Sequence, residues 1–189
     1  MTRRKVRTIC LHGAESSGKT TLAARLGDHF GAEVVPEYGR IWAETHGTEF
    51  TMADLVTIAR RHDAITQAAL ARTGGLVIVD TDPLMTAVWA EMLHGSRDPW
   101  FDAWQDYADL YLLLETDLPW QADGTRLFGT EAARARFQAL SQAELEQRGV
   151  RWARVGGVGE ARFENALRAI EGNQVLPVPG SGIRTSLAR

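Results

Sequence analysis

The sequence predicts an α/β fold in which helices flank a doubly wound, parallel five-stranded sheet. Two observations support this prediction. Short apolar runs rich in β-branched residues alternate with longer helical patterns, as right-handed strand–helix–strand crossovers require. The runs are continuously apolar rather than alternating, which is typical of strands that are covered on both faces. The predicted strands are residues 6–11, 33–36, 76–80, 110–114 and 150–155.

Helical patterns lie between and after these strands, and two of them end at a glycine that suits a helix C-terminus, Gly31 and Gly149. Residues 1–171 are predicted to form a single domain, because no strong linker or repeat interrupts them. Residues 172–189 contain Pro and Gly without periodicity and are predicted to form a flexible C-terminal tail. The predicted helices are residues 19–30, 38–45, 52–73, 83–93, 131–148 and 160–171.

A glycine-rich octapeptide follows the first apolar run and opens the first helical pattern. It reads Gly-Ala-Glu-Ser-Ser-Gly-Lys-Thr, the pattern of a phosphate-binding P-loop in its strand–loop–helix context. The glycines let backbone N–H groups turn toward phosphate oxygens, and the following helix adds its N-terminal dipole. Lys19 is predicted to bring charge to the β- and γ-phosphates as a catalytic residue, and the Thr20 hydroxyl to bind Mg²⁺. The predicted nucleotide contacts are Gly13, Ala14, Glu15, Ser16, Ser17, Gly18, Lys19, Thr20 and Thr21, with ATP and Mg²⁺ expected.

Acidic residues follow the second and third strands, at the edge of the sheet where ligands of open parallel sheets bind. Asp80 ends the third apolar run and is predicted to hold the Mg²⁺ or its water shell; alternatively it caps the helix that starts at Pro83. Asp82 suits that cap better and is also a candidate for substrate contact. Glu37 is the leading candidate for the base that takes the proton of a phosphoryl acceptor. Asp80 is its rival in this role, and a salt bridge between Glu37 and Arg40 is the alternative.

Residues 116–136 are predicted to form a lid over the phosphates, because Pro, Gly and Asp favour a loop there. Arg126 leads the predicted lid arginines, since a guanidinium is always charged and can bind phosphate bidentately. Arg134 and Arg136 follow on the next helix, and a solvent-facing basic helix start is the alternative for all three. Gly157, after the fifth strand, joins Arg126 among the predicted nucleotide contacts.

Aromatic residues near the second and third strands predict an acceptor pocket. Tyr38, Trp42 and Trp89 offer faces on which a planar base could stack, and a cationic ring would gain further from them. The predicted substrate-binding residues are Glu37, Tyr38, Arg40, Trp42, Asp82 and Trp89.

The composition is that of an ordinary globular protein, with 44% hydrophobic residues and a formal net charge of −3. The sequence lacks the excess of basic residues that would predict a nucleic-acid partner. No signal-peptide pattern occurs and no apolar stretch approaches the roughly 20 residues that span a bilayer, so we expect a cytoplasmic protein without a membrane partner. The composition is also compatible with an oligomer. The single cysteine, Cys10, is predicted to be a buried thiol, and His12, His46 and His62 receive no role because no zinc-site spacing occurs.

Taken together, these segments resemble the ribosylnicotinamide (nicotinamide riboside) kinase domain of the bacterial NadR type, within the P-loop superfamily. The resemblance covers about residues 8–170. The P-loop alone fits many families, whereas Pro-Glu-Tyr-Gly-Arg at 36–40 and Asp-Thr-Asp-Pro at 80–83 are much narrower motifs. Further matching segments are Asp-Leu-Tyr-Leu-Leu-Leu at 109–114 and Trp-Gln-Ala-Asp-Gly-Thr-Arg at 120–126.

The resemblance implies a P-loop kinase that phosphorylates the 5′-hydroxyl of nicotinamide riboside with ATP, giving nicotinamide mononucleotide for NAD salvage. At matching positions, Lys19 and Thr20 would serve phosphate and Mg²⁺, Glu37 and Asp80 the acceptor and metal region, and Arg126 the lid. Such kinases are often fused to an adenylyltransferase and sometimes to a DNA-binding module. Because only twelve residues precede the P-loop, we expect a stand-alone kinase.

Two other functions fit the same residues. A deoxynucleoside or nucleoside-monophosphate kinase would share the P-loop, the lid arginines and the acidic residue after strand two, and Arg40, Arg60 and Arg61 could bind an acceptor phosphate. A non-catalytic nucleotide-sensing ATPase module would bind nucleotide without turning over an acceptor.

Overall fold

The computed structural model describes residues 7–122 and 124–173, and within them it contains one five-stranded sheet in the order β2-β3-β1-β4-β5. All neighbouring strands run parallel, which confirms the predicted fold class. The central strand β1 pairs with β3 on one side and β4 on the other, so the segment that follows β1 lies between those that follow its neighbours. The strands are β1 (Thr8–His12), β2 (Glu33–Val35), β3 (Val77–Asp80), β4 (Leu110–Leu114) and β5 (Trp152–Val155).

The helices agree with the predicted ones within one residue at each end, and one further short helix occurs. This helix, α5, begins after Asp98, whose side chain accepts a hydrogen bond from the Trp100 backbone N–H, and has Pro99 in its first position. Its five residues are too few to show a helical periodicity. The helices are α1 (Lys19–Phe30), α2 (Tyr38–His46), α3 (Met52–Thr73), α4 (Pro83–His94), α5 (Pro99–Ala103), α6 (Glu131–Gln147) and α7 (Glu160–Gly172).

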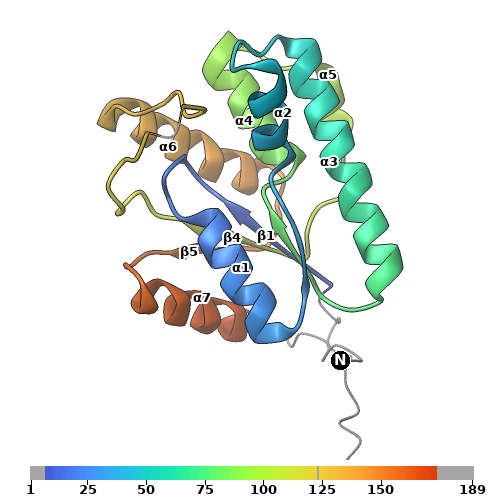
Figure 1. The fold of residues 1–189 in the computed structure, drawn as a ribbon, viewed down its shortest axis with the longest axis vertical. Helices are drawn as coiled ribbons and strands as arrows, with labels where there is room; N and C mark the ends of the chain where they lie inside the picture. The colour runs from blue at the N-terminus through green and yellow to red at the C-terminus, as the bar shows by residue number, and fades with distance from the viewer. Residues whose placement is uncertain (1–6, 123, 174–189) are drawn as a thin grey trace, which may run out of the picture.

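Helices cover both faces of the sheet (Figure 1). On one face, α1 and α7 pack against the residues of β1, β3 and β4 that include Ile9, Ile78 and Leu112. On the other face, α3, α4 and α6 contribute to a cluster around the alternate strand residues, among them Cys10 and Tyr111. Successive strand residues point to opposite faces, and in the three central strands β1, β3 and β4 every residue is buried, so these strands favour apolar residues on both faces. This explains the continuous apolar runs, and Cys10 is buried as predicted.

The carboxyl ends of the parallel strands meet at one edge of the sheet, where α2 and an irregular segment also lie. This segment joins β4 to α6 and, with the first residues of α6, occupies the range predicted as a lid. The helix α7 ends at Gly172, where the tail was predicted to begin, and the predicted tail beyond residue 173 lies outside the described residues.

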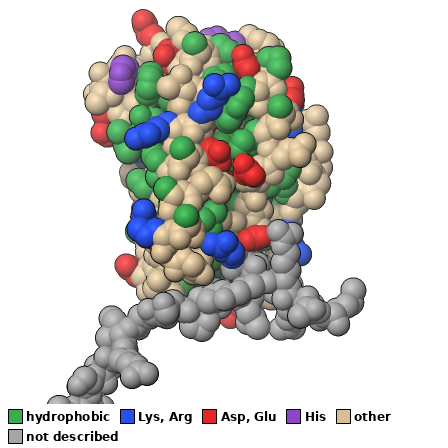
Figure 2. Space-filling view, turned by 90° about the vertical axis from the view of Figure 1, so that its right-hand side faces the viewer, with side chains coloured by type: hydrophobic (Ala, Val, Ile, Leu, Met, Phe, Trp, Pro, Cys, Tyr) green, Lys and Arg blue, Asp and Glu red, His purple; other side chains and the backbone are tan. Residues whose placement is uncertain are grey.

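Charges of both signs are spread over the surface. On the face shown in Figure 2, which is the side of α3, Lys and Arg side chains lie among acidic and apolar ones and do not join into one stripe. Within the described part of the chain, no helix combines the length and apolar character that crossing a bilayer requires.

Candidate active site

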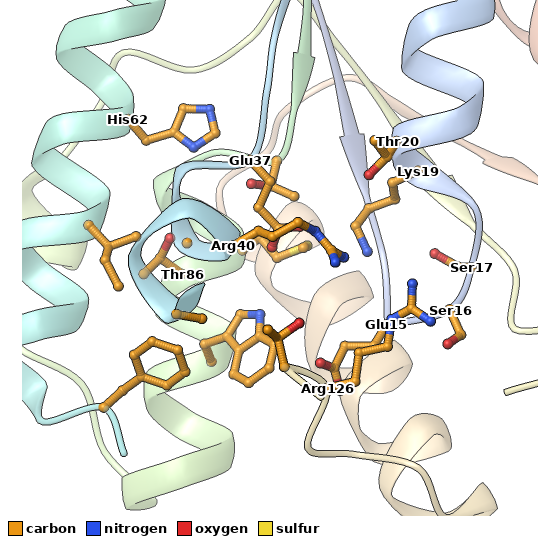
Figure 3. Close-up of a pocket in the computed structure, with 18 of the residues that line it drawn as sticks. Glu15, Ser16, Ser17, Lys19, Thr20, Glu37, Arg40, His62, Thr86 and Arg126 are labelled. Atoms are coloured by element: carbon orange, nitrogen blue, oxygen red, sulfur yellow. The ribbon is translucent and has the colours of Figure 1, made fainter. Parts of the chain in front are cut away.

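A cavity opens at the carboxyl edge of the sheet, between the P-loop, α2, α3, α4 and the lid segment (Figure 3). It encloses about 980 Å³ of space, its open mouth included. One end is the P-loop and the other is lined by apolar side chains. The lining residues are Glu15, Ser16, Ser17, Gly18, Lys19, Thr20, Thr21, Glu37, Gly39, Arg40, Ala43, Phe50, Leu55, Ile58, His62, Thr81, Met85, Thr86, Trp89, Thr125 and Arg126.

The P-loop turns tightly against β4, and its glycines are required by geometry. Gly13 has a φ of +129°, and a Cβ at this position would lie 2.8 Å from the Leu114 carbonyl oxygen. Gly18, with φ +82°, is the N-cap of α1 and offers no side-chain cap, so the first backbone N–H groups of α1 remain available to an anion. Gly13 and Ala14 do not line the cavity, whereas the other predicted P-loop residues do.

The Lys19 ammonium is folded onto the loop itself. Its Nζ donates hydrogen bonds to the carbonyl oxygens of Gly13 and Ala14, both at 2.9 Å. Burial lowers the pKa of Lys19, while the carboxylates of Glu37, Asp80 and Glu15 raise it. A buried cation therefore lies among three carboxylates at the phosphate end, where an incoming anion would gain most from it.

Thr20 and Asp80 form the candidate metal site. The Thr20 Oγ1 donates a 2.6 Å hydrogen bond to Asp80 Oδ2, while the buried Asp80 Oδ1 has no hydrogen-bond partner. Burial raises the pKa of Asp80. An orphaned carboxylate oxygen beside a hydroxyl fits Mg²⁺, which prefers oxygen ligands and takes only one or two carboxylates, completing its shell with phosphates and water. Among the described residues, no group of three or more His, Cys, Asp or Glu side chains is arranged to hold a metal ion by itself.

Asp82 is the cap of α4. Its Oδ1 accepts hydrogen bonds from the backbone N–H groups of Leu84 at 2.9 Å and Met85 at 3.3 Å, and its Oδ2 accepts one from the Tyr111 hydroxyl at 2.6 Å. Asp82 does not line the cavity. Of the two alternatives for Asp82 the geometry supports the cap, so the predicted substrate contact gains no support, and Asp80 is free of the capping role.

Glu37 stands between the two ends of the cavity. It occupies the N-cap position of α2, yet its side chain does not cap that helix and instead enters the cavity. Burial and then the charge of Asp80 raise the pKa of Glu37 to about 7, against the opposing effects of Lys19 and Arg40. Arg40 lines the cavity beside it, with its guanidinium toward Lys19 in Figure 3. Glu37 is therefore a carboxylate that can take up a proton near neutral pH.

Trp89 is the predicted stacking residue that lines the cavity, where it packs at an angle against Phe50 and Phe128. Tyr38 and Trp42 do not line the cavity, and Trp42 instead stacks on His46 with ring centroids 4.1 Å apart. The reason is helical periodicity, because residues 39, 40 and 43 of α2 face the cavity and residues 38 and 42 lie on the neighbouring face. The prediction that Tyr38 and Trp42 contact the acceptor thus has no support in this geometry.

The apolar end of the cavity was missed by sequence reasoning. Its walls come from α2, α3, α4 and the segment before α3, and they include one polar ring, His62, to which no role was assigned. Leu55, Ile58 and His62 share one face of α3 at helical spacing, which is a signal for burial but not for a cavity. The other residues at this end are Ala43, Phe50, Met85, Thr86 and Trp89.

The lid segment is fastened to the P-loop through Glu15. The Glu15 carboxylate accepts hydrogen bonds from the backbone N–H groups of Leu127, at 3.1 Å, and Phe128, at 2.9 Å. Ser16 adds a further link, because its Oγ accepts a 3.1 Å hydrogen bond from the Gln121 N–H. Two P-loop positions thus hold the lid close to the phosphate end.

Arg126 is the predicted lid arginine that reaches the cavity. It lines the phosphate end and donates a hydrogen bond to the Gln121 carbonyl oxygen. Arg134 donates to the Leu118 carbonyl oxygen at 2.9 Å and, like Arg136, does not line the cavity. The three arginines therefore separate, with Arg126 at the phosphate end and Arg134 bracing the lid.

Arg162, on α7, was not predicted to take part. It is only 4% exposed and donates hydrogen bonds to the carbonyl oxygens of Ser17 and Gly157, the latter at 2.7 Å, and to the Asp117 carboxylate. The Gly157 N–H in turn donates to Asp117 at 2.6 Å. Gly157 lies outside the cavity lining, so its predicted nucleotide contact gains no support, but its loop is tied to the back of the P-loop.

Arg60 and Arg61 lie on α3 outside the cavity lining, and the Arg60 guanidinium lies over the Trp100 ring at 5.5 Å. Of the three arginines that could bind an acceptor phosphate, only Arg40 reaches the cavity. The cavity therefore offers fewer cations to the phosphate of a monophosphate acceptor than the sequence suggested.

The sheet order, the P-loop and the lid define the fold of a P-loop kinase. Within this class, the chain belongs to the family described as AAA domain, which matches residues 8–162. It is homologous to the trifunctional NAD biosynthesis/regulator protein NadR. The Escherichia coli (strain K12) protein is 34% identical over 156 residues, which are 79% of this chain and 38% of that protein. The Salmonella typhimurium protein is 33% identical over 173 residues, 88% of this chain and 42% of that protein.

Solved structures share the fold. A crystal structure of NadR in complex with NR matches with a TM-score of 0.71 at 21% identity, over 97% of this chain and 53% of that one. Thymidylate kinase from Ehrlichia chaffeensis matches with a TM-score of 0.64 at 16% identity, over 90% of this chain and all of that one. The chain thus spans less than half of the curated relatives and about half of the NadR structure.

Proposed function

We propose that the protein transfers the γ-phosphoryl group of ATP to the 5′-hydroxyl of nicotinamide riboside, giving nicotinamide mononucleotide and ADP in NAD salvage. The observation that carries the proposal is a single cavity with a P-loop at one end, a carboxylate in the middle and an apolar, aromatic wall at the other end. A flat base with a ribose fits such an arrangement. The homology to NadR supports the same substrate, because one NadR structure of this fold holds NR.

In the proposed reaction the P-loop and Lys19 hold the ATP phosphates. Lys19 would exchange its bonds to the loop carbonyls for phosphate oxygens, and the free N–H groups at the start of α1 would add to the binding. Thr20 and Asp80 would hold Mg²⁺, which neutralises charge on the β- and γ-phosphates. Arg126 would face the transferring group from the lid side.

Glu37 is proposed as the general base. The oxygen of the acceptor hydroxyl forms the new bond to the γ-phosphorus, the bond to the β,γ-bridging oxygen breaks, and ADP leaves. The hydroxyl proton passes to the Glu37 carboxylate, whose raised pKa of about 7 makes it a better proton acceptor than an ordinary glutamate. Its place between the phosphate end and the apolar end supports this role.

The test is ADP release, coupled to NADH oxidation, with Mg-ATP and a panel of nicotinamide riboside, deoxynucleosides and nucleoside monophosphates. Turnover with nicotinamide riboside is expected, and the phosphorylated product is identified by mass spectrometry. Turnover confined to another acceptor would contradict the proposed substrate. ATP binding without turnover of any acceptor would instead indicate a nucleotide-sensing module.

A further inference from the structure

His62 is a buried polar side chain that the proposed chemistry does not use. It belongs to the middle of α3, is 1% exposed and lines the apolar end of the cavity, where its ring is directed toward the space beside Glu37 (Figure 3). Its Nε2 is buried and has no hydrogen-bond partner. Because buried polar atoms are normally paired, an orphaned ring nitrogen on a cavity wall points to a partner supplied by a ligand.

The His62 ring is uncharged at neutral pH. Burial lowers its pKa to about 4. A neutral imidazole presents one N–H donor and one acceptor nitrogen, so it can bond to a group that offers either. It also carries no charge that would repel a cationic base.

The walls around His62 lack a cation among the described residues. The neighbouring lining residues are apolar, including Leu55 and Ile58 on the same helix. The lining cations Lys19 and Arg126 lie at the phosphate end in Figure 3, and the Arg40 guanidinium is directed toward Lys19. A carboxylate bound beside His62 would lose its hydration without gaining a charged partner, which is costly, whereas a carboxamide would lose far less.

We propose that His62 is the specificity-determining residue for the acceptor base: its Nε2 hydrogen-bonds an uncharged polar substituent, such as a carboxamide, and this end of the cavity disfavours a carboxylate in the same place. The inference rests on the proposed function and narrows it to acceptors whose base carries a neutral substituent. His62 selects the base, while Glu37 and the P-loop act on the reacting atoms.

The experiment compares kcat/KM for nicotinamide riboside and nicotinic acid riboside in the full chain and in three variants. His62→Leu is expected to lower kcat/KM for the amide about tenfold, mainly through KM, because one hydrogen bond is lost, and to reduce the preference for the amide. His62→Gln, which retains a donor and an acceptor, should keep the preference. His62→Arg, which adds a cation, should shift the preference toward the acid.

His94→Leu is the matched control, because His94 is an exposed histidine in the last turn of α4 outside the cavity lining. It should leave the amide-to-acid ratio unchanged, and the KM for ATP should stay constant in all variants. The inference is overturned if His62→Leu and His62→Arg leave the amide-to-acid ratio of kcat/KM unchanged. It is also overturned if kcat/KM falls equally for both acceptors.

A failure of the proposed function can be distinguished from a failure of the inference about His62. If neither pyridine riboside is phosphorylated by the unmodified chain, that function is wrong, and the same variants are compared on uridine and the carboxylate-bearing orotidine by turnover or by competitive binding. A preference for uridine that is lost in His62→Leu would preserve the role of His62. If the preference for uridine over orotidine is the same in all variants, the proposed role of His62 is wrong.

Discussion

The two ends of the cavity are built in different ways. The phosphate end comes almost entirely from one continuous segment, residues 13–20, and offers backbone N–H groups and one lysine. The acceptor end comes from side chains of α2, α3, α4 and the segment before α3, which are distant in sequence. A site built from backbone groups therefore leaves a compact motif in the sequence, whereas a site built from side chains of separate helices leaves only scattered apolar positions.

The charges divide in the same way. Lys19, Glu15 and Arg126 line the phosphate end, and Asp80 lies beside it through its bond with Thr20, while the acceptor end is apolar apart from Thr86 and the neutral His62. Glu37 stands at the boundary, and its raised pKa reflects both burial and the nearby Asp80 charge. Substitutions at the phosphate end should therefore change the dependence on ATP, and substitutions at the acceptor end the dependence on acceptor.

The largest effect is expected for Lys19→Ala. The loss of the cation that faces the phosphates should lower kcat/KM about a thousandfold, as losses of single groups that stabilise the transition state commonly do. The fold should persist, but the melting temperature should also fall, because the Lys19 ammonium lies among the carboxylates of Glu37, Asp80 and Glu15 as well as bonding to loop carbonyls. Coupled ADP release and thermal unfolding measure the two quantities.

Arg61→Ala is the control, because Arg61 is an exposed cation of α3 outside the cavity lining. It should keep full activity. Near-normal turnover in Lys19→Ala would show that the phosphate end is misassigned.

Glu37→Gln should lower kcat about a hundredfold, because the amide cannot take up the acceptor proton. In the unmodified enzyme, kcat/KM should fall as the pH drops below about 7, since protonation of Glu37 removes the base. This acidic limb should vanish in Glu37→Gln. A change confined to the acceptor KM would make Glu37 a binding residue instead.

The same substitution should affect stability with a defined sign. The pKa of Glu37 is raised in the folded protein, so protonated Glu37 favours folding at low pH and this contribution is lost as the pH rises through about 7. The stability of Glu37→Gln relative to the unmodified chain should therefore increase as the pH rises from about 5 to about 8, as measured by urea unfolding. If the difference in the free energy of unfolding between the two proteins stays constant across this range, the raised pKa of Glu37 is contradicted.

Gly13→Ala tests whether the backbone of the phosphate end is as constrained as the geometry indicates. A positive φ and a Cβ 2.8 Å from the Leu114 carbonyl oxygen should lower the free energy of unfolding by about 2 kcal/mol. Gly31→Ala is the matched control, since Gly31 also has a positive φ but open space around it, and should cost only about 1 kcal/mol. Equal losses in urea unfolding would show that the close approach to β4 does not matter.

The smallest effect is expected for Glu15→Ala. It removes the acceptor for the Leu127 and Phe128 N–H groups, so the lid should be held less closely and the KM for ATP should rise about fivefold. The acceptor KM should stay constant, and so should both values in the control Glu49→Ala, an exposed carboxylate outside the cavity lining. A rise in the acceptor KM instead would blur the division between the two ends.

Local patterns were enough to predict the sheet, the longer helices and the phosphate end. Strand residues buried on both faces produce continuous apolar runs, and the P-loop needs glycines at fixed positions. Asp80 could also be placed, because it directly follows a buried strand that neighbours β1. The five-residue helix α5 escaped prediction because it covers less than two helical turns, which is too short to show a helical periodicity.

Prediction by sequence proximity was less successful for side chains. Tyr38 and Trp42 are close in sequence to Glu37, yet they point away from the cavity lining because α2 turns them to another face. Asp82 lies two residues from Asp80, yet the bond from Tyr111 and the capping of α4 use both of its oxygens.

The sequence by itself determined the order of the elements, the phosphate-binding loop and the carboxylates that follow the strands, since each depends on a few neighbouring residues. Only the tertiary structure decided that His62 shares a cavity with Glu37, that Glu15 holds the lid, and that Arg162 braces the P-loop from α7. The physical reason is that these contacts depend on the packing of helices whose relative positions no local pattern specifies.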